Sequence, residues 1–243
     1  MPYKGSKNRI AERIIEHLPS ATHFYDVFGG GGAITHCAIL SGKYKYVHYN
    51  EYDPLVYKAF VMACNNEFKD ENRFVSRDEF EKLKDVDPYV AICFSFGNDL
   101  KTYCYSRDKE ELKKRNHFVN KDKIRLQHKE TLNRLNSLCI NTETLSFTNC
   151  SYDDLDFEDD SVIYCDPPYK DTNTYRINFN HEKFYEWCKE QKNIYISEYN
   201  MPNDFKILKT IDKVCSLSLN NNTKSCEKLF TNNSQSITNA LEW

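Results

Sequence analysis

The sequence predicts an α/β fold with a doubly wound, largely parallel sheet. Two motifs carry the prediction. An apolar strand runs through four glycines into a helix at residues 24–40, and a second buried strand, residues 161–165, ends in Asp-Pro-Pro-Tyr. Short apolar runs elsewhere alternate with segments of helical spacing. In folds of this class, ligands bind at the carboxyl ends of the strands, where both motifs are expected to lie.

The first motif predicts a cradle for a ligand. Four of the chain's seven glycines stand at positions 29–32, and glycine is needed where a backbone turns with positive φ and passes close to a ligand. No GxGxxG and no Gly-Lys-Ser/Thr follows, so a nucleoside without phosphates fits better than a dinucleotide or a triphosphate. A second strand ends at Glu51, 25 residues after Asp26, where this class of fold places the carboxylate that holds ribose hydroxyls. The alternative is a plain tight turn.

The second motif, Asp166 to Tyr169, predicts a pair of acceptors beside an aromatic ring. Two prolines fix φ and remove two backbone donors, so the strand ends and the Asp166 carboxylate and Pro167 carbonyl lack ladder partners. The exocyclic amine of a nucleobase could donate both hydrogens to these oxygens while its ring stacks on Tyr169. The alternative is a proline-rich strand exit with an incidental tyrosine.

With these motifs the chain resembles the DNA adenine-N6 methyltransferases of the DNA adenine methylase type, which use S-adenosylmethionine. The resemblance covers nearly the whole chain and rests on Pro-Tyr-Lys-Gly-Ser-Lys at 2–7, the motif at 26–32, Tyr-Asp-Asp-Leu at 152–155 and Asp-Pro-Pro-Tyr at 166–169. The cofactor motif precedes the catalytic motif, which is the order called group alpha. Residues 179–200 look most like relatives carried by phages and prophages.

The resemblance implies a Rossmann-like S-adenosylmethionine-dependent methyltransferase sheet with a small helical insert for target recognition. The catalytic domain would comprise residues 1–94 and 144–243, and the insert residues 95–143. The target adenine would be received by Asp166, Pro167, Pro168 and Tyr169. The cofactor's methionine part would be held by Tyr3, Lys7, Asp26, Phe28, Gly29, Gly30 and Gly31, its ribose by Glu51, and its adenine by Tyr152 and Asp153, with Asp166 also next to the cofactor. The opening lacks the tryptophan and paired glycines of many relatives, and the loop has more glycines than most.

The chemistry explains these residue types. The adenine N6 lone pair is delocalised into the ring and is a poor nucleophile until its hydrogens are bound and the nitrogen pyramidalises. Direct transfer then needs positioning and charge stabilisation, with no covalent intermediate, catalytic cysteine or metal. A base inside a duplex cannot reach such a site, so we expect base flipping, at an unstacking cost of roughly a few kcal/mol.

The charge pattern predicts a DNA-binding region. The formal net charge is −3, but residues 99–134 carry eleven Lys and Arg against six Asp and Glu. Such asymmetry favours one basic face against phosphates. Tyr103, Tyr105 and Phe118 could stack on bases or wedge into the gap left by a flipped one, and a polar loop at 170–176 is expected to close over that base. The alternative is a solvated pair of helices. The candidate DNA-binding residues are Asn98, Lys101, Arg107, Lys113, Lys114, Arg115, Lys121, Lys123, Arg125, Lys170 and Arg176.

Composition narrows the remaining classes. The chain has no apolar run of about 18 residues and no signal peptide, which predicts a cytoplasmic protein without membrane contact. Ten cysteines, none spaced as CxxC, predict buried free thiols, including Cys37, Cys93 and Cys165. The histidines show no ligand spacing, so no metal is expected. We expect a monomer or weak dimer; the recognition sequence and any partner restriction endonuclease stay open.

The remaining elements follow from periodicity. We expect helices at about 9–17, 54–65, 121–138 and 181–191, strands at 89–94, 144–148 and 193–197, and a closing hairpin of 214–219 with 228–231. Other acceptors remain possible for this geometry, namely cytosine N4 in DNA, adenine N6 in RNA or a glutamine side chain. A protein that binds nucleic acid or cofactor without catalysis is the alternative from another class.

Overall fold

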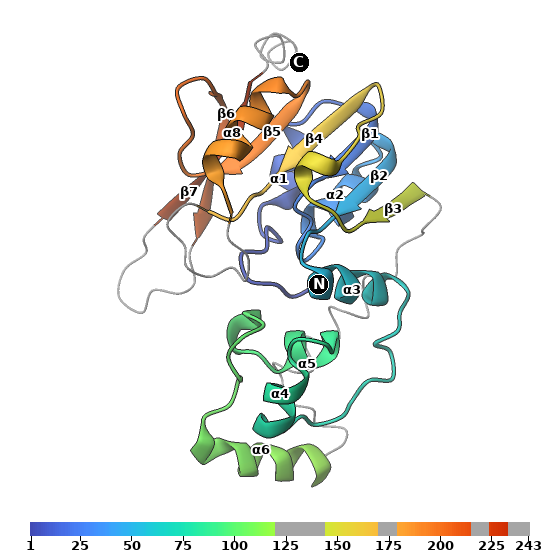
Figure 1. Ribbon diagram of the computed structural model, residues 1–243, viewed down its shortest axis with the longest axis vertical. Coiled ribbons are helices and arrows are strands. Elements are labelled where there is room, and N and C mark those ends of the chain that lie inside the picture. The colour runs from blue at the N-terminus through green and yellow to red at the C-terminus, as the bar shows by residue number, and fades with distance from the viewer. Residues whose placement is uncertain (120–143, 170–178, 215–223, 233–243) are drawn as a thin grey trace. The chain divides into compact units, whose positions relative to one another are not determined.

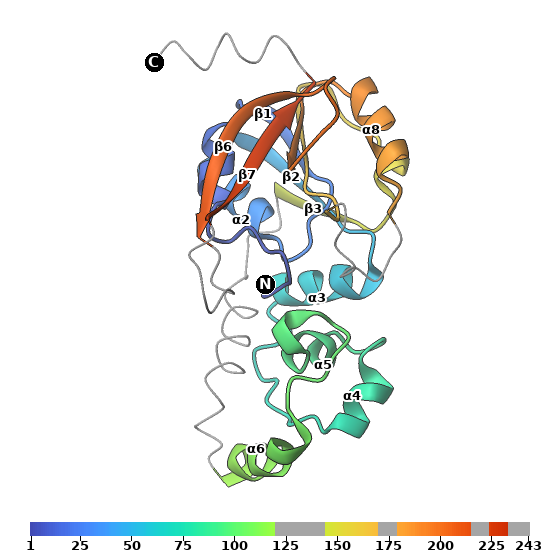
Figure 2. The ribbon, with the colours of Figure 1, turned by 90° about the vertical axis from the view of Figure 1, so that its left-hand side faces the viewer.

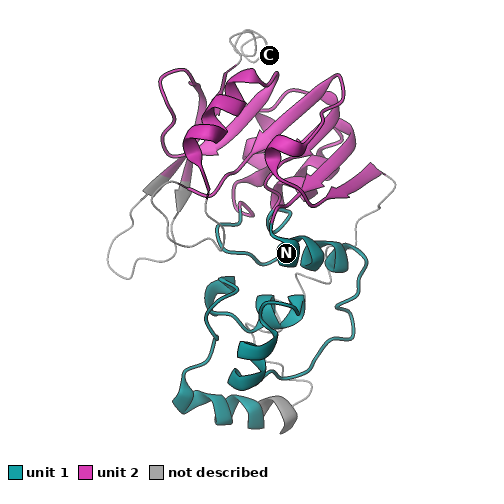
Figure 3. Cartoon of the chain, in the orientation of Figure 1, with its two compact units in different colours: residues 1–6, 30–32, 53–142 teal, residues 7–29, 33–52, 143–243 magenta. Residues whose placement is uncertain are grey.

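The computed structural model describes residues 1–119, 144–169, 179–214 and 224–232 (Figure 1). The chain divides into two compact units (Figure 3). Unit 1 comprises residues 1–6, 30–32 and 53–142, and unit 2 comprises residues 7–29, 33–52 and 143–243. Unit 1 thus takes in residues 53–94 as well as the predicted insert. The role of residues 95–143 as a recognition domain stays a prediction.

Unit 2 is built on a seven-stranded sheet in the order β3-β2-β1-β4-β5-β7-β6. The first five strands in this order pair in parallel, and β7 is antiparallel to both of its neighbours. This is the Rossmann-like methyltransferase sheet, which confirms the predicted fold class. The strands are β1 (Ala21–Asp26), β2 (Tyr44–Asn50), β3 (Leu145–Thr148), β4 (Ser161–Cys165), β5 (Ile194–Glu198), β6 (Lys206–Val214) and β7 (Lys224–Thr231).

Helices cover both faces of this sheet. Helices α1 (Ala11–Glu16) and α2 (Ala33–Ser41) lie on one face and α8 (His181–Glu190) on the other (Figures 1 and 2). Ile163 and Cys165 of β4 belong to the core under α8. Successive strand residues point to opposite faces, so Tyr164, also fully buried, faces the other way. Alternation therefore directs the residues at the end of β4 to different sides of the sheet.

Unit 1 is helical in its described part. Its helices are α3 (Pro54–Cys64), α4 (Arg77–Leu83), α5 (Pro88–Cys93), the short 3₁₀ helix η1 (Phe96–Asn98) and α6 (Arg107–Val119). Side-chain caps start three of them: Asp53 caps α3, Asp87 caps α5, and Ser76 caps α4 in a capping box with Glu79. These local signals hold helices that are too short to be stable alone.

The predicted strand at residues 89–94 is wrong. These residues form α5, because Pro88 occupies the first helical turn and the Asp87 carboxylate accepts hydrogen bonds from Tyr89 N and Val90 N at 2.9 and 3.2 Å. All six residues of α5 are buried. A helix buried on all sides reads as a continuous apolar run, and periodicity cannot separate such a run from a buried strand.

Most other predicted elements are confirmed where the structure describes them. Helices α1, α3 and α8 and strands β3 and β5 lie within one or two residues of the expected ranges or inside them. A hairpin of β6 and β7 is present, and β7 contains the predicted strand 228–231. The first strand of this hairpin was placed wrongly, because β6 covers 206–214 and shares only Val214 with the predicted 214–219. Residues 215–219 of the predicted hairpin and the predicted helix at 121–138 lie outside the described residues. No helix in the described part of the chain is long and apolar enough to cross a membrane.

Candidate active site

A buried asparagine joins the carboxyl ends of β1, β2 and β3. The Asn50 side-chain amide donates to Val27 O at 3.0 Å and to Cys150 O at 3.1 Å, and its Oδ1 accepts from Cys150 N at 3.2 Å. Its backbone carbonyl accepts from Gly29 N at 2.7 Å. The strand ends next to the glycine loop are thus fixed by one residue that the sequence analysis did not single out.

All four glycines of the loop have a steric or conformational need. A Cβ on Gly29 would lie 2.2 Å from Cε2 of the buried Tyr49, and Gly30 has φ of +49°. Gly30, Gly31 and Gly32 belong to unit 1, and Gly32 also has a positive φ, of +72°. A Cβ on Gly31 would approach the Met1 carbonyl oxygen to 2.6 Å and Tyr3 Cβ to 2.9 Å. Close approach of backbone is therefore part of this loop, as the motif predicts.

Asp26, the last residue of β1, is almost fully buried and bonded to Thr35 of α2. Its Oδ2 accepts from Thr35 N at 3.0 Å and from Thr35 Oγ1 at 2.6 Å. Burial raises the pKa of Asp26 to about 7, although the Thr35 hydrogen bonds oppose the shift. Asp26 thus ties the end of β1 to α2. Its expected contact with a cofactor stays a prediction.

Phe28 and Tyr152 belong to one aromatic cluster beside α8. Their ring centroids lie 5.9 Å apart, and both rings contact Phe179 and Phe184, with Trp187 5.0 Å from Tyr152. The cluster joins the loop after β1 to the 3₁₀ turn η3 (Tyr152–Asp154). Two sequence motifs that are far apart in the chain are thereby brought together.

The two predicted acidic residues near these motifs differ. Asp153 forms an ion pair with Lys183 and accepts from Ser151, and the Lys183 hydrogen bond is the main reason that the pKa of Asp153 is lowered. Glu51 follows β2 directly, and its backbone N donates to Thr148 O at 3.2 Å. Its side chain is half-buried. The Asp153 carboxylate therefore already binds Lys183 and Ser151. Glu51 stands at the strand end where the fold places a ribose-binding acid.

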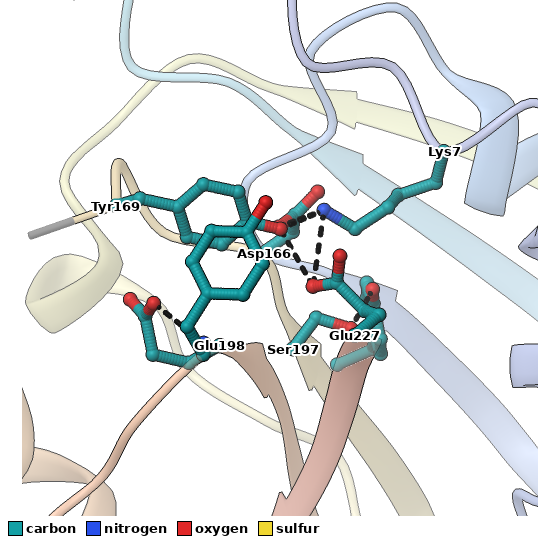
Figure 4. Close-up of polar contacts among 8 residues, drawn as sticks. Lys7, Asp166, Tyr169, Ser197, Glu198 and Glu227 are labelled. Carbon is teal, nitrogen blue, oxygen red and sulfur yellow. Dashed lines mark hydrogen bonds and ion pairs between the residues drawn. The ribbon is translucent and has the colours of Figure 1, made fainter. Parts of the chain in front are cut away.

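The turn after β4 carries the main charged cluster of unit 2. Lys7 Nζ donates to Asp166 Oδ1 at 2.7 Å and to the Tyr169 hydroxyl. That hydroxyl in turn donates to Glu227 Oε1 at 2.6 Å, which lies 3.5 Å from Lys7 Nζ. Figure 4 shows the four side chains pointing toward one another. We call Lys7, Asp166, Tyr169 and Glu227 the catalytic-turn cluster.

Burial and charge set the protonation states in this cluster. The exposed fraction of the side chain is 2% for Lys7, 1% for Glu227 and 19% for Asp166. Burial alone would lower the pKa of Lys7, but Asp166 and Glu227 outweigh it, so the pKa is raised and Lys7 is an ammonium. Burial, together with the same two carboxylates, raises the pKa of Tyr169, so its hydroxyl keeps its proton.

The end of β5 borders the cluster. Tyr164 donates its hydroxyl hydrogen to Ser197 Oγ at 2.7 Å, and Tyr199 N donates to Glu198 Oε1 at 2.8 Å. The rings of Tyr199 and Tyr169 lie 4.7 Å apart between centroids. Burial, Asp166 and Glu227 raise the pKa of Glu198 to about 7. The carboxyl groups of Asp166 after β4, Glu198 on β5 and Glu227 on β7 are therefore close enough to affect one another's ionisation.

Sequence reasoning missed Glu227, Glu198 and Asn50. A signal existed for Glu227, because it shares a strand face with Leu229 and Thr231, both fully buried. An acid on the inward face of a strand needs a buried partner. Its partners, however, are 58 and 220 residues away in the chain, and no local pattern names them.

Unit 1 carries the described part of the predicted DNA-binding set. Lys101, Arg107, Lys114 and Arg115 are exposed and Lys113 is half-buried. Asn98 differs, since its amide donates to Ile92 O at 2.8 Å and so supports the turn after α5. The remaining candidates, Lys121, Lys123, Arg125, Lys170 and Arg176, lie outside the described residues.

The expectation that Tyr103 stacks on bases is wrong. Its exposed fraction is 5%, and its hydroxyl donates to Val75 O at 2.7 Å. Arg77 covers the Tyr103 ring at 4.8 Å and forms an ion pair with Glu110 of α6 at 3.4 Å. Tyr103 is thus part of the packing that holds α6 in unit 1. Tyr105 is half-buried, and the side chain of Phe118 is not among those described.

The expected thiols and metal ligands can be placed in part. Cys93 and Cys165 are buried and Cys37 is half-buried, all as free thiols. Within the described ranges, no three His, Cys, Asp or Glu side chains are grouped so as to hold a metal ion. The expectation that the protein needs no metal stays a prediction.

Comparison with known proteins identifies the family. Residues 3–237 match the profile of the D12 class N6 adenine-specific DNA methyltransferases. The chain belongs to this family. The predicted family membership is therefore confirmed.

Similar proteins agree with this assignment. The modification methylase LlaI of Lactococcus lactis subsp. lactis is 26% identical over 212 residues, which make up 78% of this chain and 32% of that protein. The chain spans about a third of the length of this relative.

Two solved structures align with most of this chain. They are a candidate methylase, HI0767, from Haemophilus influenzae (TM-score 0.39, 14% identity, covering 92% of this chain and 88% of that one) and the ribosomal RNA methyltransferase AviRa from Streptomyces viridochromogenes (TM-score 0.43, 12% identity, 98% and 89%). At these scores, the fold assignment rests on the strand order itself.

Proposed function

We propose that this chain transfers a methyl group from S-adenosylmethionine to N6 of adenine in double-stranded DNA after flipping the base. The observation that carries the proposal is the placement of the Asp166 carboxylate at the carboxyl end of β4, bonded to the Lys7 ammonium and followed by two prolines and Tyr169. Family membership supplies the reaction class, and this turn supplies the groups that the reaction needs.

The residues of unit 2 fit the cofactor. When bound, S-adenosylmethionine supplies an electrophilic methyl group on a sulfonium. Gly29, whose missing Cβ leaves room for the Tyr49 ring, would carry the backbone past the cofactor at the end of β1. Glu51 would hold the ribose hydroxyls, and Phe28 and Tyr152 offer aromatic surface to an adenine. Asp153 would have to share its carboxylate with Lys183, or bind through its backbone. Tyr3, Gly30 and Gly31 belong to unit 1, and their part in cofactor binding is proposed from the family motif alone.

The catalytic turn activates the target amine. The Asp166 carboxylate and the Pro167 carbonyl accept the two N6 hydrogens, which localises the nitrogen lone pair. As the new C–N bond forms, the bond between the methyl carbon and the sulfonium sulfur would break, and the sulfur would keep the electron pair as a neutral thioether. The Asp166 carboxylate would take one N6 proton, so the nitrogen returns to neutrality. Lys7 holds one oxygen of Asp166, so the carboxylate keeps a fixed direction.

The aromatic and basic residues bind the DNA. Tyr169 stacks on the flipped adenine, and the exposed cations Arg107, Lys114 and Arg115 of α6 bind phosphates. Phosphate contacts position the duplex without reading its sequence. The recognition sequence is therefore left to side chains that reach base edges.

The test is methyl transfer with purified protein and tritium-methyl S-adenosylmethionine. Unmethylated duplex DNA, single-stranded DNA and RNA are offered separately, and the labelled nucleoside is identified. Label in N6-methyladenine of duplex DNA is the expected result. Label in N4-methylcytosine or in RNA would overturn the substrate but keep the chemistry. No transfer by a folded protein that binds the cofactor would favour the non-catalytic alternative.

A further inference from the structure

A buried glutamate from the last described strand reaches the catalytic turn. Glu227 lies on β7, which pairs with β5, and its exposed fraction is 1%. Its Oε1 accepts from the Tyr169 hydroxyl at 2.6 Å and lies 3.5 Å from Lys7 Nζ. Lys7 Nζ in turn lies 2.7 Å from Asp166 Oδ1. One carboxylate oxygen of Glu227 thus contacts Tyr169 and also Lys7, which in turn holds Asp166 (Figure 4).

This position is costly for a carboxylate. The second oxygen, Oε2, is buried and has no hydrogen-bond partner among the described residues. Burying a charge carries a desolvation penalty of about several kcal/mol unless it is well paired. Here the Lys7 ammonium is the counter-ion of two carboxylates, Asp166 and Glu227, and these two negative charges repel each other. The same face of β7 buries Leu229 and Thr231 without a charge, so the packing of the strand alone does not explain the glutamate.

We propose that Glu227 is a positioning residue for the methyl transfer. It orients the Tyr169 ring through the phenolic hydroxyl and holds Lys7 so that the ammonium bridges to Asp166. This inference rests on the proposed function and adds to it a residue outside the sequence motifs. Glu227 does not touch the reacting atoms; it acts through Tyr169 and Lys7.

The geometry explains why both contacts are needed. A tyrosine ring that receives a flipped base must hold one orientation, and a hydrogen bond at its far end fixes the ring without covering its face. Lys7 is drawn toward Asp166 and Glu227 at once, which keeps its flexible side chain in one place. Pre-organisation of this kind lowers the reorganisation needed during the reaction.

The first variant removes the charge and keeps the shape. Glu227→Gln retains an oxygen that can accept from Tyr169 but loses the ion pair with Lys7. We expect kcat to fall about 10- to 100-fold, with KM for DNA and cofactor changed less than about threefold. The matched control is Glu186→Gln on α8, whose side chain is 73% exposed and pairs with Lys189. This control should retain full activity.

The second variant approaches the same contact from the other side. Tyr169→Phe removes the hydroxyl and keeps the ring and Glu227. We expect a similar fall in kcat, and a double variant no worse than about threefold below the poorer single variant, because both changes break one coupled unit. If Glu227→Gln does not fold, Tyr169→Phe alone decides: activity equal to the unsubstituted protein overturns the inference.

A pH profile separates positioning from mere packing. The titratable groups around Glu227 on the neighbouring elements are Lys7, Tyr164, Tyr169 and Glu198, with Asp166 next to Lys7. Removing the Glu227 charge should lower the pKa of Lys7, so the basic limb of the kcat profile should move to lower pH in Glu227→Gln. An unmoved limb, or strictly additive losses in the double variant, would overturn the inference. An unsubstituted protein without activity would instead overturn the proposed function.

Discussion

Charged side chains in the two units stand in opposite environments. The catalytic-turn cluster of unit 2 buries Lys7 and Glu227 almost completely, and it joins the Lys7 ammonium, Glu227 Oε1 and the Tyr169 hydroxyl within 3.5 Å of one another. The basic residues of α6 in unit 1 are largely exposed, and α6 itself is held by Arg77 and Glu110. The energy of a buried charge depends on the geometry of its few direct partners. Exposed charges add up to a field over the surface, and salt screens that field. The first arrangement suits chemistry, and the second suits a polyanion.

The largest effect should follow from Asp166. Asp166→Ala, and also the isosteric Asp166→Asn, should lower kcat by about 10³-fold or more, because the amine loses its charged acceptor and Lys7 loses its nearest carboxylate. Cofactor and DNA binding should change little. Transfer of tritiated methyl groups to duplex DNA measures the first quantity, and equilibrium binding the second. Asp159→Ala, at an exposed position before β4, is the control; activity retained in Asp166→Ala would refute the assigned role.

The exposed cations of α6 should affect binding and leave chemistry intact. The triple variant Arg107→Gln, Lys114→Gln, Arg115→Gln should weaken DNA binding about 100-fold at moderate salt. It should also reduce the slope of log K against log salt by about 2 to 3, since each lost phosphate contact removes about 0.9. Titrations at several salt concentrations measure both. The control neutralises three exposed lysines of unit 2, Lys192, Lys206 and Lys209; an equal loss there would mean that α6 has no special part.

Glu198 should make stability depend on pH. Burial, with Asp166 and Glu227, raises its pKa from 4.5 to about 7, so the folded protein binds more protons than the unfolded chain between these values. This contribution is present below about pH 4.5 and is lost as the pH rises through about 7. Glu198→Gln should therefore gain about 1 to 3 kcal/mol relative to the unsubstituted protein on going from pH 5 to pH 8.

Urea unfolding at pH 5 and pH 8 measures this difference. Asp26, whose pKa is also raised to about 7 by burial, contributes with the same sign in both proteins and cancels in the comparison. The exposed Glu186→Gln should show no such gain. An equal pH dependence in Glu198→Gln and in the unsubstituted protein would mean that Glu198 ionises normally.

The smallest effect concerns a cap in unit 1. Ser76 Oγ accepts from Glu79 N at 3.3 Å, and Glu79 Oε2 accepts from Ser76 N at 2.8 Å. Ser76→Ala should cost about 1 kcal/mol of the free energy of unfolding and leave methyl transfer unchanged. Ser76→Thr, which restores a capping hydroxyl, should recover most of it. A loss of activity in Ser76→Ala at full folding would show that unit 1 influences the chemistry.

The sequence alone was sufficient for the fold and for the two motifs. Strand periods, the glycines at 29–32 and the prolines at 167 and 168 are local signals, because steric limits on φ and on backbone donors act within a few residues. The same holds for helix caps. Where the local signal is ambiguous, as in the buried run at 88–93, the prediction was wrong, since only Pro88 and the Asp87 cap separate helix from strand there.

The tertiary structure alone decided which side chains share a site. Tyr103 reads as a surface aromatic in a basic segment, yet the packing of α4 and α6 buries it. Glu227 reads as one polar residue in an alternating strand, yet β7 pairs with β5 and carries it to Tyr169 and Lys7. Pairing and burial depend on residues far apart in the chain, and the energy of a charge depends on its surroundings. The sequence by itself therefore determined the motifs, and the packed sheet decided how their charges are joined.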